Sequence, residues 1–251
     1  MLLKIGLNTS GKDEIKFNKT MSVLSIVATP IGNLEDITLR ALRILREADF
    51  ILCEDTRVTK KLLNVYKINT PTISYHQHSG RFKIDKIIEL LRADKKIALV
   101  ADAGTPGISD PGSFLVSSVR QELKGEVIIE CIPGPSALTA ALSLVGQGFD
   151  RFLFLGFLPH KKGRQTLIKE IVNSSYPVVL YESKHRLIKL LTELETFSAL
   201  NRKSQRIFLA KELTKIHETL YEGLASELRK KLQSKEGNLK GEFVVLINNL
   251  L

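Results

Sequence analysis

The sequence predicts an α/β protein with two α/β halves. Three apolar segments typical of buried strands each end in a loop rich in glycine and proline, and each loop leads into a helical pattern. Strand and helix patterns alternate along most of the chain, which favours a largely parallel sheet covered on both faces. With 251 residues, 43% of them hydrophobic, the chain can bury a substantial core as one large or two small domains.

The most informative loop follows the strand predicted over 97–101. It reads ADAGTPGISDPG over 101–112, and its glycines allow close approach of the backbone to a ligand while its prolines limit its freedom. Comparable loops occupy 29–34 and 132–137, where Ser136 is placed to cap a helix over 137–144. Because ligands of open α/β sheets bind beyond the carboxyl ends of the strands, these loops predict a ligand crevice.

Familiar nucleotide-binding fingerprints do not describe these loops. The segment GTPG lacks the Gly-Lys-Ser/Thr ending of a P-loop, and no strand leads into G-x-G-x-x-G with an acidic residue about twenty positions later. An ordinary nucleotide site is therefore disfavoured.

The remaining elements follow from hydrophobic periodicity. In the first half, strands are expected at 22–28, 50–54, 72–75, 97–101 and 127–131, with further helices at 38–48, 56–66, 82–93 and 113–122. In the second half, strands are expected at 152–156, 178–181, 206–211 and 242–247, with helices at 164–173, 185–195 and 224–233. The segment 146–150 is the expected link, so the predicted domains are 21–145 and 146–251.

Eight motifs in chain order give the sequence a family resemblance. They are VATPIGNLEDITLRAL (27–42), CEDTR (53–57), ADAGTPGISDPG (101–112), PGPSALTAAL (133–142), GFLP (156–159), LYESKHR (180–186), AKELTKIHET (210–219) and GEFVVLI (241–247). Together they resemble the bacterial 2'-O-ribose cytidine methyltransferases of small-subunit ribosomal RNA, in the tetrapyrrole methylase superfamily. The resemblance implies S-adenosylmethionine as cofactor, a cytidine in the decoding region of 16S ribosomal RNA as target, a mixed second sheet, a cofactor cleft between the domains, and a homodimer.

The resemblance also implies a set of cofactor-binding residues. They are Pro30, Ile31, Thr105, Pro106, Gly107, Ile108, Ser136, Ala137, Tyr181, Glu242 and Phe243. Since this cofactor carries its own leaving group, the chemistry demands no metal and no second cofactor.

A base that removes the ribose hydroxyl proton could assist the transfer. The catalytic candidates are Glu54, Asp55, Glu182 and Lys211, and the same chemistry is available to His76, His78, His185 and Glu212. The residue pattern does not choose among them. The spacing of His76 and His78 could suit a metal pair, but no third ligand is evident, so a surface or RNA-facing role is favoured.

Charge is concentrated in the second half of the chain. Residues 151–251 carry 18 Lys and Arg against 10 Asp and Glu, whereas residues 1–150 carry 19 against 17, within a total of +10. This asymmetry suits a polyanion such as nucleic acid. The predicted RNA contacts are Arg57, Lys60, Lys61, Lys161, Lys162, Arg164, His185 and Arg186.

Two simpler roles compete with RNA binding. Arg57 could pair with Glu54 or Asp55 at the surface, and Arg229 to Lys231 could be a solubilising face. His185 and Arg186 could equally cap a helix.

The cysteines and the apolar runs of the sequence indicate where in the cell the protein is located. Cys53 and Cys131 are isolated and are expected to be reduced core residues, with no structural disulfide. No apolar run is long enough to span a membrane, and residues 1–20 lack the apolar core of a signal peptide, so a cytoplasmic location is expected. Residues 1–20 precede the family-like sequence and are expected to be a disordered extension or a mis-assigned start.

The sequence leaves three functions open. The leading one is ribose methylation of small-subunit ribosomal RNA, acting on an assembled subunit. The second is methylation of a tetrapyrrole precursor on the same scaffold, and the third is a non-enzymatic RNA-binding or ribosome-assembly factor. The chain ends a few residues after the GEFVVLI motif, without the small C-terminal extension common in this family, so RNA recognition is expected to rest on the two main domains.

Overall fold

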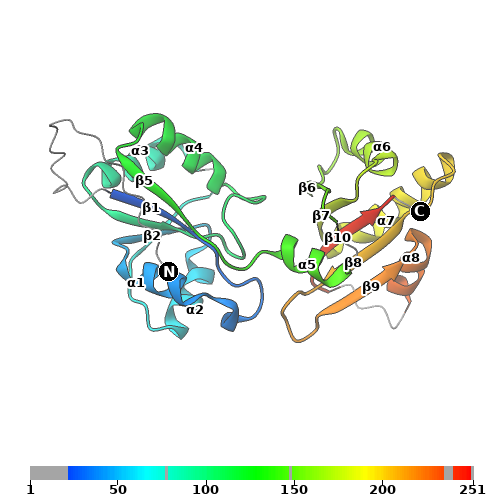
Figure 1. Ribbon diagram of the computed structural model, residues 1–251, viewed down its shortest axis with the longest axis horizontal. Coiled ribbons are helices and arrows are strands. Elements are labelled where there is room, and N and C mark those ends of the chain that lie inside the picture. The colour runs from blue at the N-terminus through cyan, green and yellow to red at the C-terminus, as the bar shows by residue number, and fades with distance from the viewer. Residues whose placement is uncertain (1–21, 77–78, 147–148, 235–239, 250–251) are drawn as a thin grey trace, which may run out of the picture.

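A computed structural model describes residues 22–76, 79–146, 149–234 and 240–249. These residues form two halves, each built on a five-stranded sheet (Figure 1). The expected extension at 1–20, the candidate His78 and the centre of the expected link lie outside the described residues.

The first sheet is parallel throughout. Its strand order is β3-β2-β4-β1-β5, and all four neighbouring pairs are parallel. The strands are β1 (Ser22–Val27), β2 (Phe50–Cys53), β3 (Thr72–Ser74), β4 (Lys96–Leu99) and β5 (Val127–Ile132). Parallel pairing brings the carboxyl ends of all five strands to one edge, and the Gly/Pro loops therefore meet there. The expected parallel first sheet is confirmed.

Helices cover both faces of this sheet (Figure 1). They are α1 (Leu39–Glu47), α2 (Thr56–Val65), α3 (Arg81–Arg92) and α4 (Gly112–Leu123), with a short 3-10 turn η1 (Leu34–Asp36). Hydroxyl and carboxylate caps begin two of them: Thr38 accepts from the Ala41 N–H at 3.0 Å, and Asp55 accepts from the Arg57 N–H at 2.8 Å. One apolar cluster lies under α3 and α4 and another under α1 and α2.

The second sheet is mixed, as the family resemblance implies. Its order is β6-β7-β10-β8-β9, with β6 parallel to β7 and the other three pairs antiparallel. The strands are β6 (Leu153–Phe157), β7 (Val178–Ser183), β8 (Arg206–Lys211), β9 (Thr219–Gly223) and β10 (Glu242–Asn248). Strand β9 is absent from the sequence-based expectation, because as a half-exposed edge strand it lacks an apolar run.

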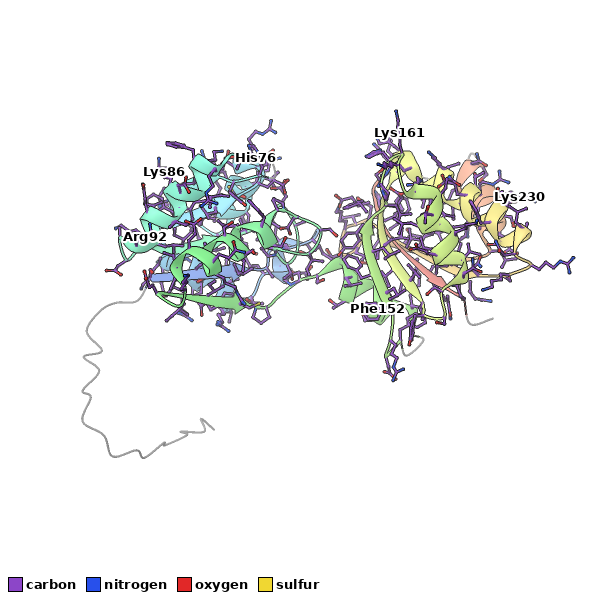
Figure 2. The ribbon with its side chains drawn as sticks, turned by 90° about the horizontal axis from the view of Figure 1, so that it is seen from above. His76, Lys86, Arg92, Phe152, Lys161 and Lys230 are labelled. Carbon is purple, nitrogen blue, oxygen red and sulfur yellow. The ribbon has the colours of Figure 1, made fainter. Side chains whose placement is uncertain are left out.

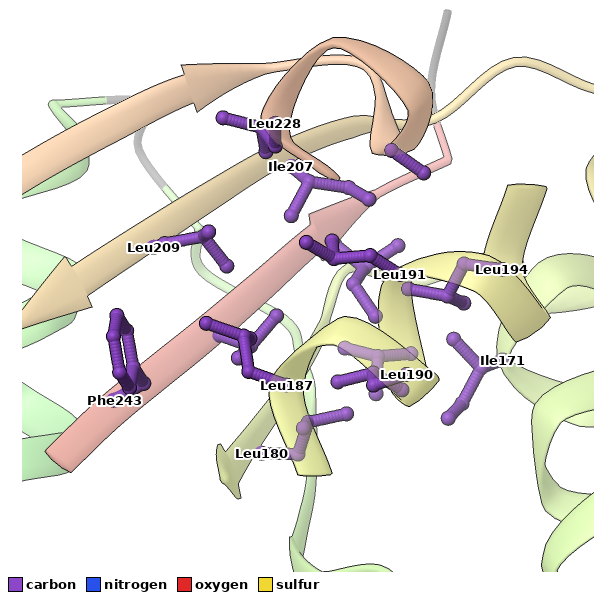
Figure 3. Close-up of a cluster of buried hydrophobic side chains, with 14 of the residues drawn as sticks. Ile171, Leu180, Leu187, Leu190, Leu191, Leu194, Ile207, Leu209, Leu228 and Phe243 are labelled. Carbon is purple, nitrogen blue, oxygen red and sulfur yellow. The ribbon is translucent and has the colours of Figure 1, made fainter. Parts of the chain in front are cut away.

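The helices α6 (Arg164–Asn173), α7 (Lys184–Leu200) and α8 (Ala225–Gln233) cover one face of the second sheet. On α7, Leu187, Leu190, Leu191 and Leu194 recur at helical spacing. Figure 3 shows these side chains packed toward Ile207 and Leu209 of β8 and Phe243 of β10. This cluster fixes the carboxyl end of β7 and the first turn of α7, both of which border the site described below.

Helix α5 (Ala137–Val145) packs on the opposite face of the second sheet, against Val179, Phe208 and Val244. The proposed domain boundary between residues 145 and 146 thus separates α5 from the sheet that it covers. In Figure 1, α5 lies between the two halves and directly follows the loop after β5.

The two cysteines differ in position. Cys53 is buried at the end of β2, as expected, whereas Cys131 is exposed. The expectation of a core position for Cys131 is wrong, because β5 is an edge strand and only alternate residues of it face the core. No helix within the described residues is long and apolar enough to cross a membrane.

Candidate active site

A cleft opens where the loops of the first sheet meet the second half. Its volume is about 320 Å³, and residues of both halves line it. The first half contributes Ile31, Glu54, Ala101 to Thr105, Ile108 to Asp110, Ser136 and Ala137. The second half contributes Phe157, Tyr181 to Ser183, Ala210, Leu213, Lys215 and Glu242 to Val244. The loops singled out in the sequence therefore converge on one cavity.

Loop contacts hold the two halves together beside the cleft. The Asn33 N–H donates to the Thr214 hydroxyl at 3.0 Å, and a Cβ added at Gly32 would lie 2.5 Å from Cγ of Lys215. Likewise, a Cβ at Gly156 of β6 would lie 2.5 Å from Oγ of Ser109. Glycine is required at 32, where a Cβ would also lie 2.8 Å from the Leu213 carbonyl oxygen, whereas at 156 the φ of +58° favours it.

Most of the predicted cofactor residues line the cleft. They are Ile31, Thr105, Ile108, Ser136, Ala137, Tyr181, Glu242 and Phe243, whereas Pro30, Pro106 and Gly107 do not line it. Gly107 instead shapes the loop: it has φ +89°, and its N–H donates to Asp110.

Two carboxylates of the 101–112 loop are held by backbone N–H groups. Asp110 accepts from Gly107 at 2.8 Å and from Gly112 at 2.7 Å, and Asp102 accepts from Asp55 at 3.0 Å. Both aspartates line the cleft and were not among the predicted site residues, although both lie in the quoted motif. Their hydrogen bonds show that they organise the loop.

Glu54 and Asp55 are neighbours in the chain, but their side chains have different surroundings. Asp55 caps α2 and accepts from the Arg57 guanidinium at 2.6 Å, which lowers the pKa of Asp55 to about 2. Glu54 lines the cleft and has no hydrogen bond or ion pair to any described residue. Burial raises the pKa of Glu54, repulsion by Asp102 and Asp110 adds to the rise, and His76 opposes it.

Glu182 borders the same cleft but is ion-paired. Its Oε1 accepts from the Arg186 Nε at 2.7 Å and from the Ser183 N–H at 2.8 Å, and its Oε2 lies 3.8 Å from the Arg164 Nη1. The Glu182 and Arg164 side chains are 0% and 2% exposed. The prediction that Arg164 contacts RNA is wrong, because its guanidinium is buried between Glu182 and Glu193.

Two lysines of the second half also differ. Lys215, which the sequence reasoning missed, lines the cleft and pairs with Glu242 at 2.9 Å and Glu212 at 3.0 Å. Burial lowers the pKa of Lys215, but these two carboxylates outweigh it and the net shift is upward. Lys211 is buried and does not line the cleft, since it alternates along β8 with Ala210, which does.

The aromatic side chains give the second half an apolar wall. The Tyr181 ring lies 5.1 Å from that of Phe154 and 5.5 Å from that of Phe157, both in tilted or edge-on contact. Burial raises the pKa of the Tyr181 phenol, while a backbone hydrogen bond with Leu138 acts in the opposite direction. Phe157 was not predicted, although it lies in the quoted GFLP segment.

The sequence that forms these two α/β halves and the loop-lined cleft matches a known family. Residues 23–229 match the Tetrapyrrole (Corrin/Porphyrin) Methylases. The chain belongs to the tetrapyrrole methylase family. Diphthine synthase shares this fold, with a TM-score of 0.67 at 17% identity over 90% of each chain. Uroporphyrin III C-methyl transferase from Thermus thermophilus gives 0.63 at 16% identity, over 90% of this chain and 97% of that one.

Closer relatives identify the branch of the tetrapyrrole methylase family. Ribosomal RNA small subunit methyltransferase I of Thermotoga maritima is 41% identical over 228 residues, covering 91% of this chain and 99% of the relative. The protein of the same name from Synechocystis is 44% identical over 230 residues, covering 90% of this chain and 79% of the relative. The chain belongs to this family of relatives as well, so the predicted recognition is confirmed.

The cations predicted to contact RNA lie mainly on the surface of this tetrapyrrole methylase. Arg57, Lys60, Lys61, Lys161, Lys162 and His185 are exposed, although Arg57 is paired with Asp55. Arg186 is largely buried by its pairing with Glu182. Figure 2 shows His76 and Lys161 on the same side of the molecule, one in each half.

Proposed function

We propose that the chain uses S-adenosylmethionine to methylate the 2'-hydroxyl of a cytidine in the decoding region of 16S ribosomal RNA. The observation that supports this most strongly is the 41% identity to a ribosomal RNA small subunit methyltransferase along nearly the whole length of both chains. The loops that line the cleft belong to the shared motifs, which argues against a vestigial pocket and a purely structural role in ribosome assembly.

The residues of the cleft suit that cofactor. A volume of about 320 Å³ falls within the ~300–1,000 Å³ of small-molecule sites. Tyr181, Ala210, Leu213 and Val244 offer an apolar surface for an adenosyl group, and the carboxylates of the opposite wall suit its positive charge. When bound, the cofactor supplies a methyl group on a sulfonium that leaves as a neutral thioether, so no metal is required.

Glu54 is the best-placed proton acceptor among the catalytic candidates. Asp55 is fixed as a helix cap, Glu182 is paired with two arginines, and Lys211 does not line the cleft. Glu54 takes the proton that the ribose hydroxyl loses as its oxygen bonds to the methyl carbon. Positioning of the ribose supplies much of the acceleration, and the base adds roughly 10²–10⁴-fold.

The exposed cations Lys60, Lys61, Lys161 and Lys162 would hold the phosphates of the RNA. We extend the proposal to an assembled small subunit as substrate, a homodimer as the working form and the cytoplasm as location. Support comes from the family resemblance and from the basic second half.

The test is transfer of labelled methyl from S-adenosylmethionine to small ribosomal subunits that lack the modification, with naked 16S RNA and a tetrapyrrole precursor in parallel. A single 2'-O-methylcytidine in the decoding region, formed in subunits and not in naked RNA, is the expected result. Label in the tetrapyrrole alone would assign the chain to the other branch of the superfamily. Label in neither, with RNA still bound, would indicate an assembly factor.

A further inference from the structure

Three exposed lysines and two exposed histidines lie on two segments of the second half that the Arg186 hydrogen bond to the Leu158 carbonyl connects. They are His160, Lys161 and Lys162 of the loop between β6 and α6, with Lys184 and His185 of the first turn of α7, and we call them the basic ridge. No ion pair connects any of them to a described residue, in contrast to Arg57, which pairs with Asp55, and Arg229, which pairs with Glu195. The three lysines of the ridge therefore have positive charge available for an anion.

A buried ion-pair network connects the loop that carries the ridge to the core of the second half. Arg186 joins Glu182 at 2.7 Å and donates to the Leu158 carbonyl at 2.8 Å. Arg164 joins Glu193 at 2.8 Å and donates to the Pro159 carbonyl at 3.3 Å. Both arginines thus connect carboxylates of the folded core to the backbone of the loop that carries the ridge.

This network leads to the cleft. Glu182 lines the cleft, and Phe157, which also lines it, directly precedes the two carbonyls that the arginines hold. The loop therefore leaves the cleft at Phe157 and reaches the surface at His160 within three residues. The ridge residue His160 is thus three residues along the chain from the cleft residue Phe157.

Two buried polar atoms of the network have no hydrogen-bond partner among the described residues: Nη2 of Arg164 and Oε2 of Glu182. Burial of a polar or charged group whose hydrogen-bonding capacity is not fully used costs free energy. Charge burial is weak evidence for stability, so a positioning role for the network explains the arrangement better than stabilisation does.

We propose that the basic ridge binds RNA phosphates, and that Arg164 and Arg186 are positioning residues that aim it toward the cleft. The proposal rests on the proposed function for its substrate, and it reassigns both arginines from direct contact to support. Because a lysine carries the same charge without the planar fork, Arg186→Lys separates the two roles. A direct phosphate contact would survive this change, whereas the link from Glu182 to the Leu158 carbonyl would not.

The experiment measures binding of fluorescent 16S RNA over a range of salt concentrations, with no methyl transfer needed. For Lys161→Ala/Lys162→Ala, affinity should fall about tenfold at ~0.1 M salt, and the slope of log K against log salt should lose about 1–2 units. The matched control Lys203→Ala/Lys230→Ala removes the same charge from exposed sites outside the ridge and should keep the slope. Figure 2 places Lys230 at the far end of the second half from Lys161. An unchanged slope in the ridge variant, or an equal loss in the control, would overturn the ridge as the binding surface.

Arg186→Lys should raise the KM for small subunits about five- to tenfold, leave S-adenosylmethionine affinity within twofold, and speed amide exchange of residues 158–163. Unchanged KM and unchanged exchange would overturn the positioning role. The exchange measurement needs no activity and, read against the melting temperature, separates local loosening from failure to fold. If the wild-type chain binds RNA through the ridge but methylates none, the proposed function fails and the ridge stands.

Discussion

The carboxylates on the two walls of the cleft have different partners. On the second-half wall, Glu182 and Glu242 are each paired with a cation, Arg186 and Lys215. On the first-half wall, Asp102 and Asp110 are held by backbone N–H groups, and Glu54 is held by none of the described residues. One wall is charge-balanced and the other is negative. The difference supports the proposal that the first half carries the chemistry and the second half positions the substrate.

The largest effect is expected for a substitution of Glu54, the cleft carboxylate that no described residue holds. Glu54→Gln keeps the shape but cannot accept a proton, so kcat for RNA methylation should fall about 10²–10⁴-fold while cofactor affinity changes little. Single-turnover rates and calorimetric titration with S-adenosylmethionine measure the two quantities. Glu126→Gln, at an exposed site just before β5, is the control and should match wild type. A Glu54→Gln enzyme with wild-type kcat would remove Glu54 from the chemistry.

A second substitution tests the second-half wall, where the carboxylates are ion-paired. Glu182→Gln leaves Arg186 without its carboxylate partner and Arg164 with Glu193 alone, so the free energy of unfolding should drop by about 3–5 kcal/mol. Urea unfolding followed by circular dichroism measures it, with the exposed Glu170→Gln as reference. Loss of activity with undiminished stability would instead place Glu182 in the chemistry.

The smallest effect is expected at Asp55, next to Glu54. Asp55→Asn keeps an oxygen that can cap α2, so methylation should stay within about tenfold of wild type, below the effect of a lost general base. The same single-turnover assay compares the two neighbours directly. A drop at Asp55 that equals the one at Glu54 would erase the distinction drawn between them.

The sequence predicted the position of the cleft well because the cleft depends on loops. In a parallel sheet, the loops after β1, β4 and β5 must gather at one edge, so the segments 29–34, 101–112 and 132–137 predict the cleft without knowledge of packing. Short apolar strands and capped helices are local features, and they were found close to their true bounds. Edge strand β9 was missed because its own sequence lacks a strand pattern. Its pairing with β8 holds it in the sheet.

Charged residues were harder to assign because their roles depend on distant partners. The residues around Arg164 have the composition of a surface loop. Its side chain is nevertheless buried against Glu193, 29 residues later, and against Glu182. Lys215 reaches the cleft only because antiparallel pairing brings Glu242 beside its loop. No local pattern encodes such pairings. Lysines 161 and 162, which form no ion pair with any residue that the structure describes, were predicted as exposed cations and are exposed.

The pH dependence of single-turnover methyl transfer, measured for wild type and Glu54→Gln, tests the central claim most directly. The base must be ionised, and burial raises its pKa above the ordinary value for glutamate. The wild-type rate should therefore fall as the pH drops through that raised pKa, approaching tenfold for each pH unit below it. The variant should be slow and lack this dependence. A variant that keeps the wild-type slope would contradict the assignment of Glu54 as the proton acceptor.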